Sequence, residues 1–405
     1  MLIVGVLVVT TVVAARRRSM PRSEAATRAT AAHAGATSAP HEFVSVNASR
    51  GLDAGDLAVL ASDSSSAGAQ STVVHQGTLD LTLVERRGRV INAAPDGAGY
   101  PLSTLAVDPT RISATTNNHV AASLDRGMVV VGATAALVDD LQVGDKITVL
   151  GWSNLSRTFK IGTIAPDEVV AGTELMMSID AARSVGLDRP FSVRTWAFPS
   201  RKAAVAFEHD TSVSWARQPI RVRSSWDNPL LDDTIPQARI KQLLGNFWIR
   251  RSATGGLQVD PIWKAATITN SPMPILGVIR CHPIVAKAGA AALQELRDAG
   301  LASLIHVADT RRYGGCFSAR VTRSLAGNAG HNLSRHTWGA AIDLNPSDNP
   351  YGGAPHMDQR VIDAFLHHGF AWGGTFLIPD PMHFEYVGPG AIVSSSMPGD
   401  GARRS

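Results

Sequence analysis

Two short motifs near the end of the chain place the tightest constraint on its fold. They read SRHTWGAAID at 334–343 and DPMHFEY at 380–386. Asp343 follows His336 by seven positions across a Gly-Ala-Ala turn, and His383 arrives about forty residues later. Two neutral imidazoles and one carboxylate, with a fourth position left for water, are the ligand set of a catalytic zinc site. The fold must therefore bring these separated segments together.

A second carboxylate stands close to the last of these residues. Asp380 precedes His383 by three positions, so one helical turn or a tight loop would place it beside the metal without using it as a ligand. A water molecule that attacks an amide at a metal site needs such a neighbouring base. The pair of motifs therefore predicts hydrolytic chemistry as well as metal binding.

This block resembles a known family, the zinc D-alanyl-D-alanine carboxypeptidases and L-alanyl-D-glutamate endopeptidases of bacterial cell walls. The family pattern is Ser-x-His-x-x-Gly-x-Ala-x-Asp followed by an acidic-x-x-His element. Both halves are present here, as Ser334, His336, Gly339, Ala341 and Asp343, then Asp380 and His383. The resemblance extends over roughly Trp226 to Pro389.

The resemblance implies a zinc-dependent metallopeptidase that hydrolyses peptide bonds in peptidoglycan stem peptides by attack of a metal-bound water. His336, Asp343 and His383 would hold Zn²⁺, and Asp380 would be the catalytic base. Whether the enzyme acts as a carboxypeptidase or an endopeptidase stays open.

Three further residues are candidates for the site. Arg320 lies sixteen positions before His336, where some relatives carry an arginine that polarises the scissile carbonyl. A guanidinium suits that role because it stays charged and aims two donors at one oxygen. Arg312 is the second candidate for substrate binding, and Ser334 is expected to hydrogen-bond near the metal ligands or the substrate.

Two other readings of the chain remain open. The same fold and ligand set occur in Hedgehog signalling domains, so a non-catalytic, zinc-containing cell-wall-binding or signalling module is an alternative. Asp380 and a candidate arginine favour the enzyme. An accessory partner of an ABC transporter is the other alternative, and it depends on the N-terminal half.

The N-terminal half has the pattern of an α+β domain. Leu79, Leu81 and Leu83 alternate with polar residues as in a half-buried strand, and a Val-Gly-Asp turn at 143–145 leads into a strand from Lys146 to Leu150. This arrangement resembles the extracytoplasmic domain of MacB-like ABC-transporter permeases. No phosphate-binding Gly-x-x-x-x-Gly-Lys-Ser/Thr loop occurs in the sequence, so it predicts no ATPase. An unrelated spacer domain is the alternative.

We therefore expect an α+β protein in which a zinc peptidase domain, with a central antiparallel sheet flanked by helices, follows a separate N-terminal α+β domain. The expected segments are an apolar membrane stub at 1–18, a flexible linker at 19–40, the N-terminal domain at 41–200, a linker at 201–225, the peptidase-like domain at 226–390 and a disordered tail at 391–405.

The expected location is the cell envelope, outside the cytoplasm, with membrane association through the N-terminus. The apolar run of Leu2 to Ala15 falls short of the roughly 20 residues of a spanning helix. Three arginines follow it, which is the reverse of a signal peptide. A truncated N-terminus would explain both features.

The net charge and the cysteine content limit the classes of binding partner and the redox state to be expected. A formal charge of +4 is mildly favourable for anionic peptidoglycan, and no basic cluster interleaved with aromatics predicts nucleic-acid binding. Cys281 and Cys316 are the two cysteines, and they would form a disulfide in an exported protein or stay as buried thiols.

Local signals predict several elements of the second half. Pro283 opens a helix that ends at Gly300, and a last helix runs from Asp358 to His368. Leu301 to Ala308 is expected to be a strand, and 309–315 a loop.

Overall fold

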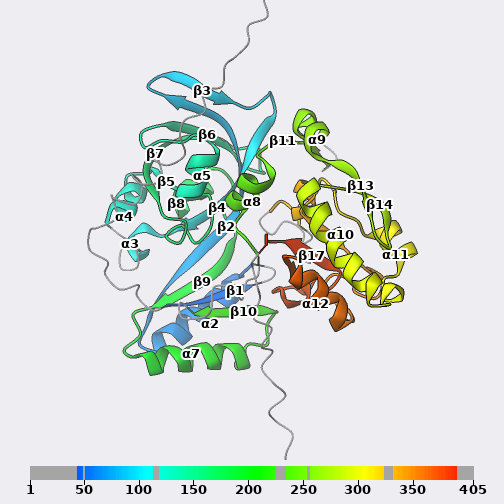
Figure 1. The fold of residues 1–405 in the computed structure, drawn as a ribbon. Helices are drawn as coiled ribbons and strands as arrows, with labels where there is room; N and C mark the ends of the chain where they lie inside the picture. The colour runs from blue at the N-terminus through cyan, green and yellow to red at the C-terminus, as the bar shows by residue number, and fades with distance from the viewer. Residues whose placement is uncertain are drawn as a thin grey trace, which may run out of the picture. The chain divides into compact units, whose positions relative to one another are not determined.

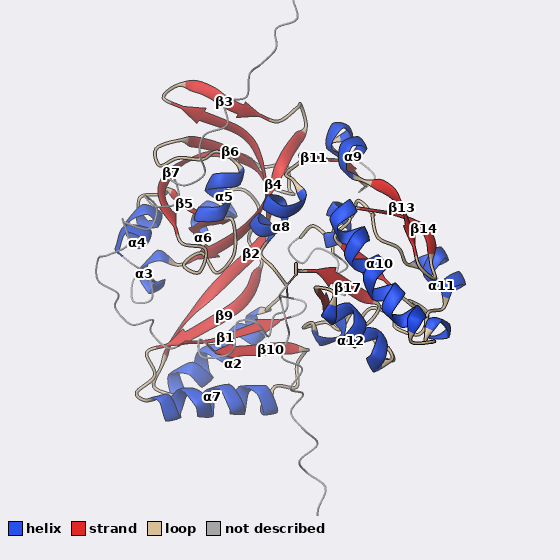
Figure 2. Ribbon diagram, viewed as in Figure 1, coloured by secondary structure: helices blue, strands red, loops and turns tan. Residues whose placement is uncertain are grey.

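The computed structural model describes residues 43–48, 51–112, 118–224, 234–252, 256–322 and 332–389. These all lie in one compact unit that begins at His41. The predicted membrane stub at 1–18, the linker at 19–40 and the tail at 391–405 fall outside the described residues. The fold is a mixed α+β structure, as predicted for the class (Figures 1 and 2).

Six strands of the N-terminal part close into a barrel. Their hydrogen-bonded order is β2-β6-β7-β5-β8-β4, and β4 pairs back onto β2 from His75↔Ala106 to Leu81↔Tyr100. Closure removes the sheet edges and encloses an apolar core that includes Leu79, Leu102 and Ile147. The strands are β2 (Gln70–Arg86), β4 (Ala98–Val107), β5 (Val129–Gly132), β6 (Lys146–Leu150), β7 (Ser156–Ala165) and β8 (Leu175–Ser178).

The predicted strand around Leu79 is confirmed as the long strand β2. Leu79 and Leu81 are buried, but Thr78 and Asp80 are buried as well, so this part of the strand is covered on both faces instead of being half-buried. The register with β6 then shifts between Leu81 and Leu83, so that Val84 instead of Leu83 turns into the core. A bulge of this kind reverses the in-and-out pattern, which the alternation of leucines alone could not show. The predicted strand from Lys146 to Leu150 is β6.

Short elements complete the barrel region. The hairpin strand β3 pairs with the end of β2. Helix α6 begins after Ser178, whose side chain accepts a hydrogen bond from the Ala181 amide as an N-cap does. The elements are β3 (Arg89–Ala93), α3 (Pro109–Ile112), α4 (Asn118–Asp125), α5 (Ala133–Val138) and α6 (Ile179–Arg183).

The same sheet continues past the barrel on both sides. On one side the order is β2-β9-β1-β10, with helices α2 and α7 in this region. The residues 201–225, expected to be a linker, instead contain α7 and β10, which pairs with β1. Ala204, Phe207 and Thr211 form the buried stripe of α7, and its exposed face carries Val205 and Val213 among polar residues. The bounds are β1 (Phe43–Ala48), α2 (Ala54–Ser66), β9 (Pro190–Trp196), α7 (Arg201–Ser214) and β10 (Ile220–Ser224).

On the other side the sheet takes in strands from the peptidase-like region. Strand β11 (Ile249–Arg251) pairs with both β4 and β12 (Leu257–Val259). Helix α8 (Gln237–Leu244) precedes them, and its Lys241 side chain is fully buried. The Lys241 Nζ lies 2.7 Å from Glu174 Oε1 and 3.8 Å from Asp139 Oδ2. The hydrogen-bonded sheet therefore crosses the predicted boundary between the two halves.

A smaller sheet of order β15-β17-β16 forms the centre of the second half. All its strands are antiparallel, and helices α10 and α12 pack together beside it (Figure 2). A separate hairpin, β13–β14, leads into α10. The bounds are α9 (Pro261–Thr267), β13 (Thr269–Met273), β14 (Gly277–Cys281), α10 (Pro283–Asp298), β15 (Ala341–Asp343), α12 (Gln359–His367), β16 (Phe370–Trp372) and β17 (His383–Tyr386).

The predicted helices α10 and α12 are confirmed, whereas the predicted strand from Leu301 to Ala308 is wrong. That stretch holds a 3-10 turn, η2 (Ala302–Leu304), and the start of α11 (Val307–Tyr313). The expected loop at 309–315 is therefore mostly helix. A short apolar run does not distinguish a strand from a helical segment, because both bury it.

Candidate metal centre

The first motif folds into a tight turn followed by a short strand. Ser334 caps the 3-10 helix η3 (Arg335–Trp338), and the backbone N–H of His336 donates to its Oγ at 3.4 Å. Gly339 ends this helix with φ of 62°, in the left-handed region. A Cβ at Gly339 would also lie 2.8 Å from the backbone nitrogen of His282. The glycine of the motif is thus needed for both conformation and space.

Sheet pairing brings the second motif to the first. Strand β15 ends at Asp343, and β17 begins at His383. These two residues are direct partners in the antiparallel register. Directly opposite residues in such a pair have Cβ atoms about 5 Å apart, which is close enough for a shared ion.

Three ligand-type atoms converge in the buried centre. Nε2 of His336 lies 3.0 Å from Asp343 Oδ1 and 3.1 Å from His383 Nδ1, and the third side of the triangle, from His383 Nδ1 to Asp343 Oδ1, is 3.0 Å. The three residues are 2%, 5% and 6% exposed. Tetrahedral zinc with bonds of about 2.0–2.1 Å spaces its ligand atoms about 3.3 Å apart. The triangle is therefore close to the size of a metal site.

The outer contacts of both histidines direct electron pairs into this triangle. Nδ1 of His336 donates to the Cys316 carbonyl at 2.6 Å, so the neutral ring presents a lone pair at Nε2. Nε2 of His383 faces the Glu385 carboxylate at 3.6 Å, which favours a proton there and a lone pair at Nδ1. With the Asp343 oxygen, the triangle holds three electron-pair donors. Such a set suits a divalent cation, and partners of this kind orient metal-binding imidazoles.

The titration behaviour of the centre follows from its burial and charges. Burial would raise the pKa of Asp343, but His336 and then His383 hold it well below the usual range. Burial would lower the pKa of His383, but the Asp343 and Glu385 carboxylates, which accept hydrogen bonds from the ring, raise it to about 10. Without a metal ion in the triangle, a proton on His383 therefore supplies part of the positive charge that the ion would bring. A metal must displace that proton.

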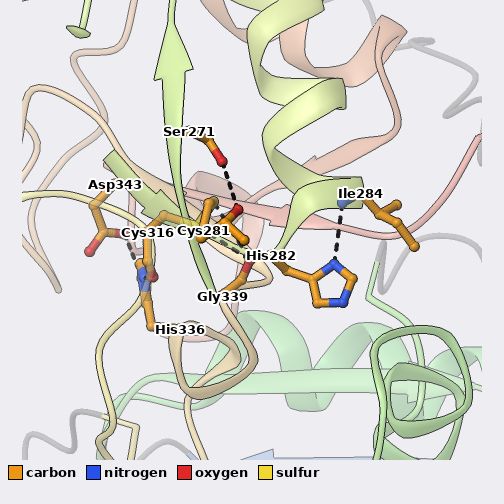
Figure 3. Close-up of a disulfide and its surroundings, with 9 residues drawn as sticks. Ser271, Cys281, His282, Ile284, Cys316, His336, Gly339 and Asp343 are labelled. Atoms are coloured by element: carbon orange, nitrogen blue, oxygen red, sulfur yellow. Dashed lines mark hydrogen bonds and ion pairs between the residues drawn. A yellow bond between two sulfur atoms is a disulfide. The ribbon is translucent and has the colours of Figure 1, made fainter. Parts of the chain in front are cut away.

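A disulfide holds the Cys316 end of this arrangement. Cys281 and Cys316 are bonded, with Cα atoms 5.3 Å apart, so the structure has the disulfide and not the alternative of two buried thiols (Figure 3). It ties the end of β14 to the residue whose carbonyl accepts from His336. The sequence separation is 35 residues, and closing such a loop in the unfolded chain stabilises the fold by about 4 kcal/mol in the chain-entropy model.

Asp380 and Arg320 line one cleft together with His383. The cleft has a volume of about 620 Å³, and Ser334, Phe376 and Glu385 are also in its walls. Asp380 is half-buried, and its carbonyl accepts a hydrogen bond from the His383 amide in the turn before β17. Nη2 of Arg320 lies 3.5 Å from Asp343 Oδ2. The two predicted catalytic residues therefore lie in the walls of the cleft that His383 also lines.

The other two predicted substrate-binding residues lie in different places. Ser334 lines the cleft but is itself buried, with its hydroxyl against the His336 amide. Arg312 is in the last turn of α11 and is exposed. It is not among the described residues that line the cleft.

Two charged residues of the site, Glu385 and Arg335, were not predicted from the sequence. Glu385 is 4% exposed and accepts from Nε of Arg335 at 2.8 Å, while its other oxygen faces His383. Burial would raise the pKa of Glu385, but Arg335 and His383 lower it. A usable signal was present, because Glu385 follows His383 by two positions and so lies on the same face of strand β17.

Residues 327–386 match the family model of D-alanyl-D-alanine carboxypeptidase. The resemblance predicted from the two motifs is confirmed over this segment. It contains His336, Asp343, Asp380 and His383, whereas Arg312 and Arg320 lie before it. This segment is therefore similar to that carboxypeptidase family, and its buried His-Asp-His cluster could hold a metal.

The chain is also similar to a solved structure, the extracellular domain of the noncanonic ABC-type transporter YknZ from Gram-positive bacteria. The identity is 6%, the match covers 45% of this chain and 99% of that chain, and the TM-score is 0.27. A likeness at this score carries no functional argument. No curated protein matches the chain. Within the described part of the chain, no helix is long and apolar enough to cross a bilayer.

Proposed function

We propose that this chain is a zinc-dependent peptidase that hydrolyses peptide bonds in peptidoglycan stem peptides. One observation carries the proposal: three buried ligand-type atoms, 3.0–3.1 Å apart, direct electron pairs at one point inside a segment that matches a carboxypeptidase family. His336, Asp343 and His383 would hold the ion. Bound there, zinc would polarise a peptide carbonyl and acidify a water molecule.

Asp380 is the proposed proton carrier. It shares the cleft with His383 but is not part of the triangle, so its carboxylate can exchange protons. It would accept a proton from the attacking water and return it to the leaving amine. Such general acid–base catalysis typically contributes about 10²–10⁴-fold in rate.

Arg320 is proposed to bind the oxygen of the scissile carbonyl. Its guanidinium reaches the edge of the metal centre, 3.5 Å from Asp343, and it faces the same cleft as Asp380. A fixed positive charge at that position stabilises negative charge as it develops on the oxygen. Ser334 would act by positioning His336, because its hydroxyl accepts from the His336 amide.

We place this activity in the cell envelope, outside the cytoplasm, as a further part of the proposal. The Cys281–Cys316 disulfide supports an oxidising compartment. Attachment to the membrane through the first eighteen residues stays a prediction.

The test is mass spectrometry of stem peptides incubated with the purified full chain. We expect loss of D-alanine or cleavage after L-alanine, and the product mass distinguishes carboxypeptidase from endopeptidase action. Asp380→Asn should lower kcat by about 10²–10⁴-fold while zinc content stays unchanged. Asp363→Asn, an exposed change on α12, is the matched control and should leave kcat unchanged.

Two outcomes would contradict the proposal. If the zinc-loaded parent cleaves no stem peptide, the chain is a zinc-containing binding module instead. If Asp380→Asn cleaves as fast as the parent, the proton carrier has been assigned to the wrong residue.

A further inference from the structure

A second cluster of ligand-type side chains lies outside the cleft, on the helices of the small domain. Glu295 is in the last turn of α10, His367 is the last residue of α12 and His368 is its C-cap. Helices α10 and α12 pack against each other, and Figure 2 shows them side by side. The cluster is exposed to solvent, with side-chain exposures of 44%, 72% and 26% in the same order.

Both imidazoles converge on a single oxygen atom. Nδ1 of His367 lies 3.0 Å and Nε2 of His368 lies 2.9 Å from Oε2 of Glu295. All three atoms are within 4.8 Å of one another. Two histidines that each form a separate ion pair with one carboxylate could each contact a different oxygen of it. Convergence on one oxygen leaves the electron pairs of three groups within reach of one small cation.

The surrounding backbone favours positive charge at this point. Helix α12 ends at His367, and α10 ends three residues after Glu295, at Asp298. The C-terminal end of a helix carries a partial negative charge from its unpaired carbonyls, and this charge stabilises a cation placed there. Two helix ends and one carboxylate therefore act in the same direction.

We propose that Glu295, His367 and His368 bind a late first-row divalent transition metal, such as Zn²⁺, Cu²⁺ or Ni²⁺. Imidazole and carboxylate ligands suit these ions, whereas Mg²⁺ and Ca²⁺ prefer sites made of oxygen alone. Three protein ligands on an open surface leave the remaining positions to water. This site is independent of the proposed peptidase chemistry, and the chain would bind two metal ions.

Equilibrium dialysis of the full chain against Zn²⁺, followed by metal analysis, tests the stoichiometry. The parent should bind two equivalents. In His367→Ala, His368→Ala and Glu295→Gln, the second equivalent should bind at least about tenfold more weakly, because even partners beyond the ligands contribute 10–100-fold to metal affinity. The first equivalent should not change. All three residues are at the surface, so the variants should fold.

A second measurement reports on exposed histidines and leaves out the buried centre. Untagged protein should be retained on a Ni²⁺-charged resin, because an immobilised ion can reach His367 and His368 but not the buried centre. His367→Ala and His368→Ala should elute at lower imidazole concentration. His209→Ala, which removes an exposed helical histidine from α7, should elute like the parent.

The proposal is overturned if the parent binds one zinc and the three variants elute and bind like it. It is also overturned if His209→Ala shortens retention as much as His367→Ala does, since the retention would then be a property of any surface histidine. Failure of the peptidase assay would leave this site untouched.

Discussion

Two buried charge clusters in this molecule differ in the source of the cation at their centre. In the first, Lys241 of α8 lies between Glu174 and Asp139 of the barrel region. In the second, His336 and His383 surround Asp343. The Lys241 cluster contains its own cation. In the His336 cluster three electron-pair donors face one position, which suits a cation or a proton from outside.

The pKa directions express the same difference. Burial would lower the pKa of Lys241, but Asp139 and Glu174 raise it, so the ammonium stays charged inside the protein. In the other cluster the pKa of His383 rises to about 10 because the negative groups around it recruit a proton. The Lys241 cluster joins α8 to the barrel region. The His336 cluster is the one that we propose to bind an ion.

The largest effect should come from removing one of the proposed metal ligands in the His336 cluster. His336→Ala takes away one of the three donors, so we expect zinc in the buried centre and any peptidase activity to be lost. The protein should still fold, because Asp343 keeps His383 as a partner. Metal analysis and thermal unfolding measure the two effects. Undiminished zinc in the buried centre would break the comparison, because His336 would then not be a ligand.

A change in the Lys241 cluster should have the opposite result, with a loss of stability and no loss of zinc. Lys241→Met leaves Glu174 and Asp139 buried without their cation, and removing one partner of a buried ion pair costs about 3–5 kcal/mol of unfolding free energy. Zinc per folded chain should not change. Denaturant unfolding checks the first expectation and metal analysis the second. Lys202→Met, at an exposed position of α7, is the control and should stay within about 0.5 kcal/mol of the parent.

The smallest effect concerns pH. His383 is protonated below about pH 10 in the metal-free protein, and a bound metal must displace that proton. The affinity for zinc should therefore rise with pH, by up to about tenfold for each unit, which corresponds to about 1.4 kcal/mol. Competition titration with a zinc chelator between pH 6 and 8 measures the slope. A flat profile would mean that His383 is already neutral in the metal-free protein, and that Asp343 and Glu385 raise its pKa less than the structure indicates.

Local signals in the sequence predicted much of the second half correctly. The two motifs identified the family resemblance, the capping residues located α10 and α12, and the two cysteines raised the disulfide as one of two alternatives. Each of these features depends on a few residues close together in the chain or on a fixed spacing. The strand misassigned at 301–308 shows the limit, because a short apolar run suits either a strand or a helix.

The sequence alone determined which groups could form the metal centre, since the residue types and spacings of His336, Asp343 and His383 specify donor chemistry directly. Tertiary structure decided everything that depends on distant partners. Pairing of β15 with β17 sets Asp343 opposite His383, and the Cys316 carbonyl and Glu385 select the ring nitrogens that face inward. Pairing of β2 with β4 closes the barrel, and the fold of α8 against it buries Lys241 between two carboxylates. These contacts join residues far apart in sequence, and no local pattern encodes them because each partner looks ordinary until the chain brings the other beside it.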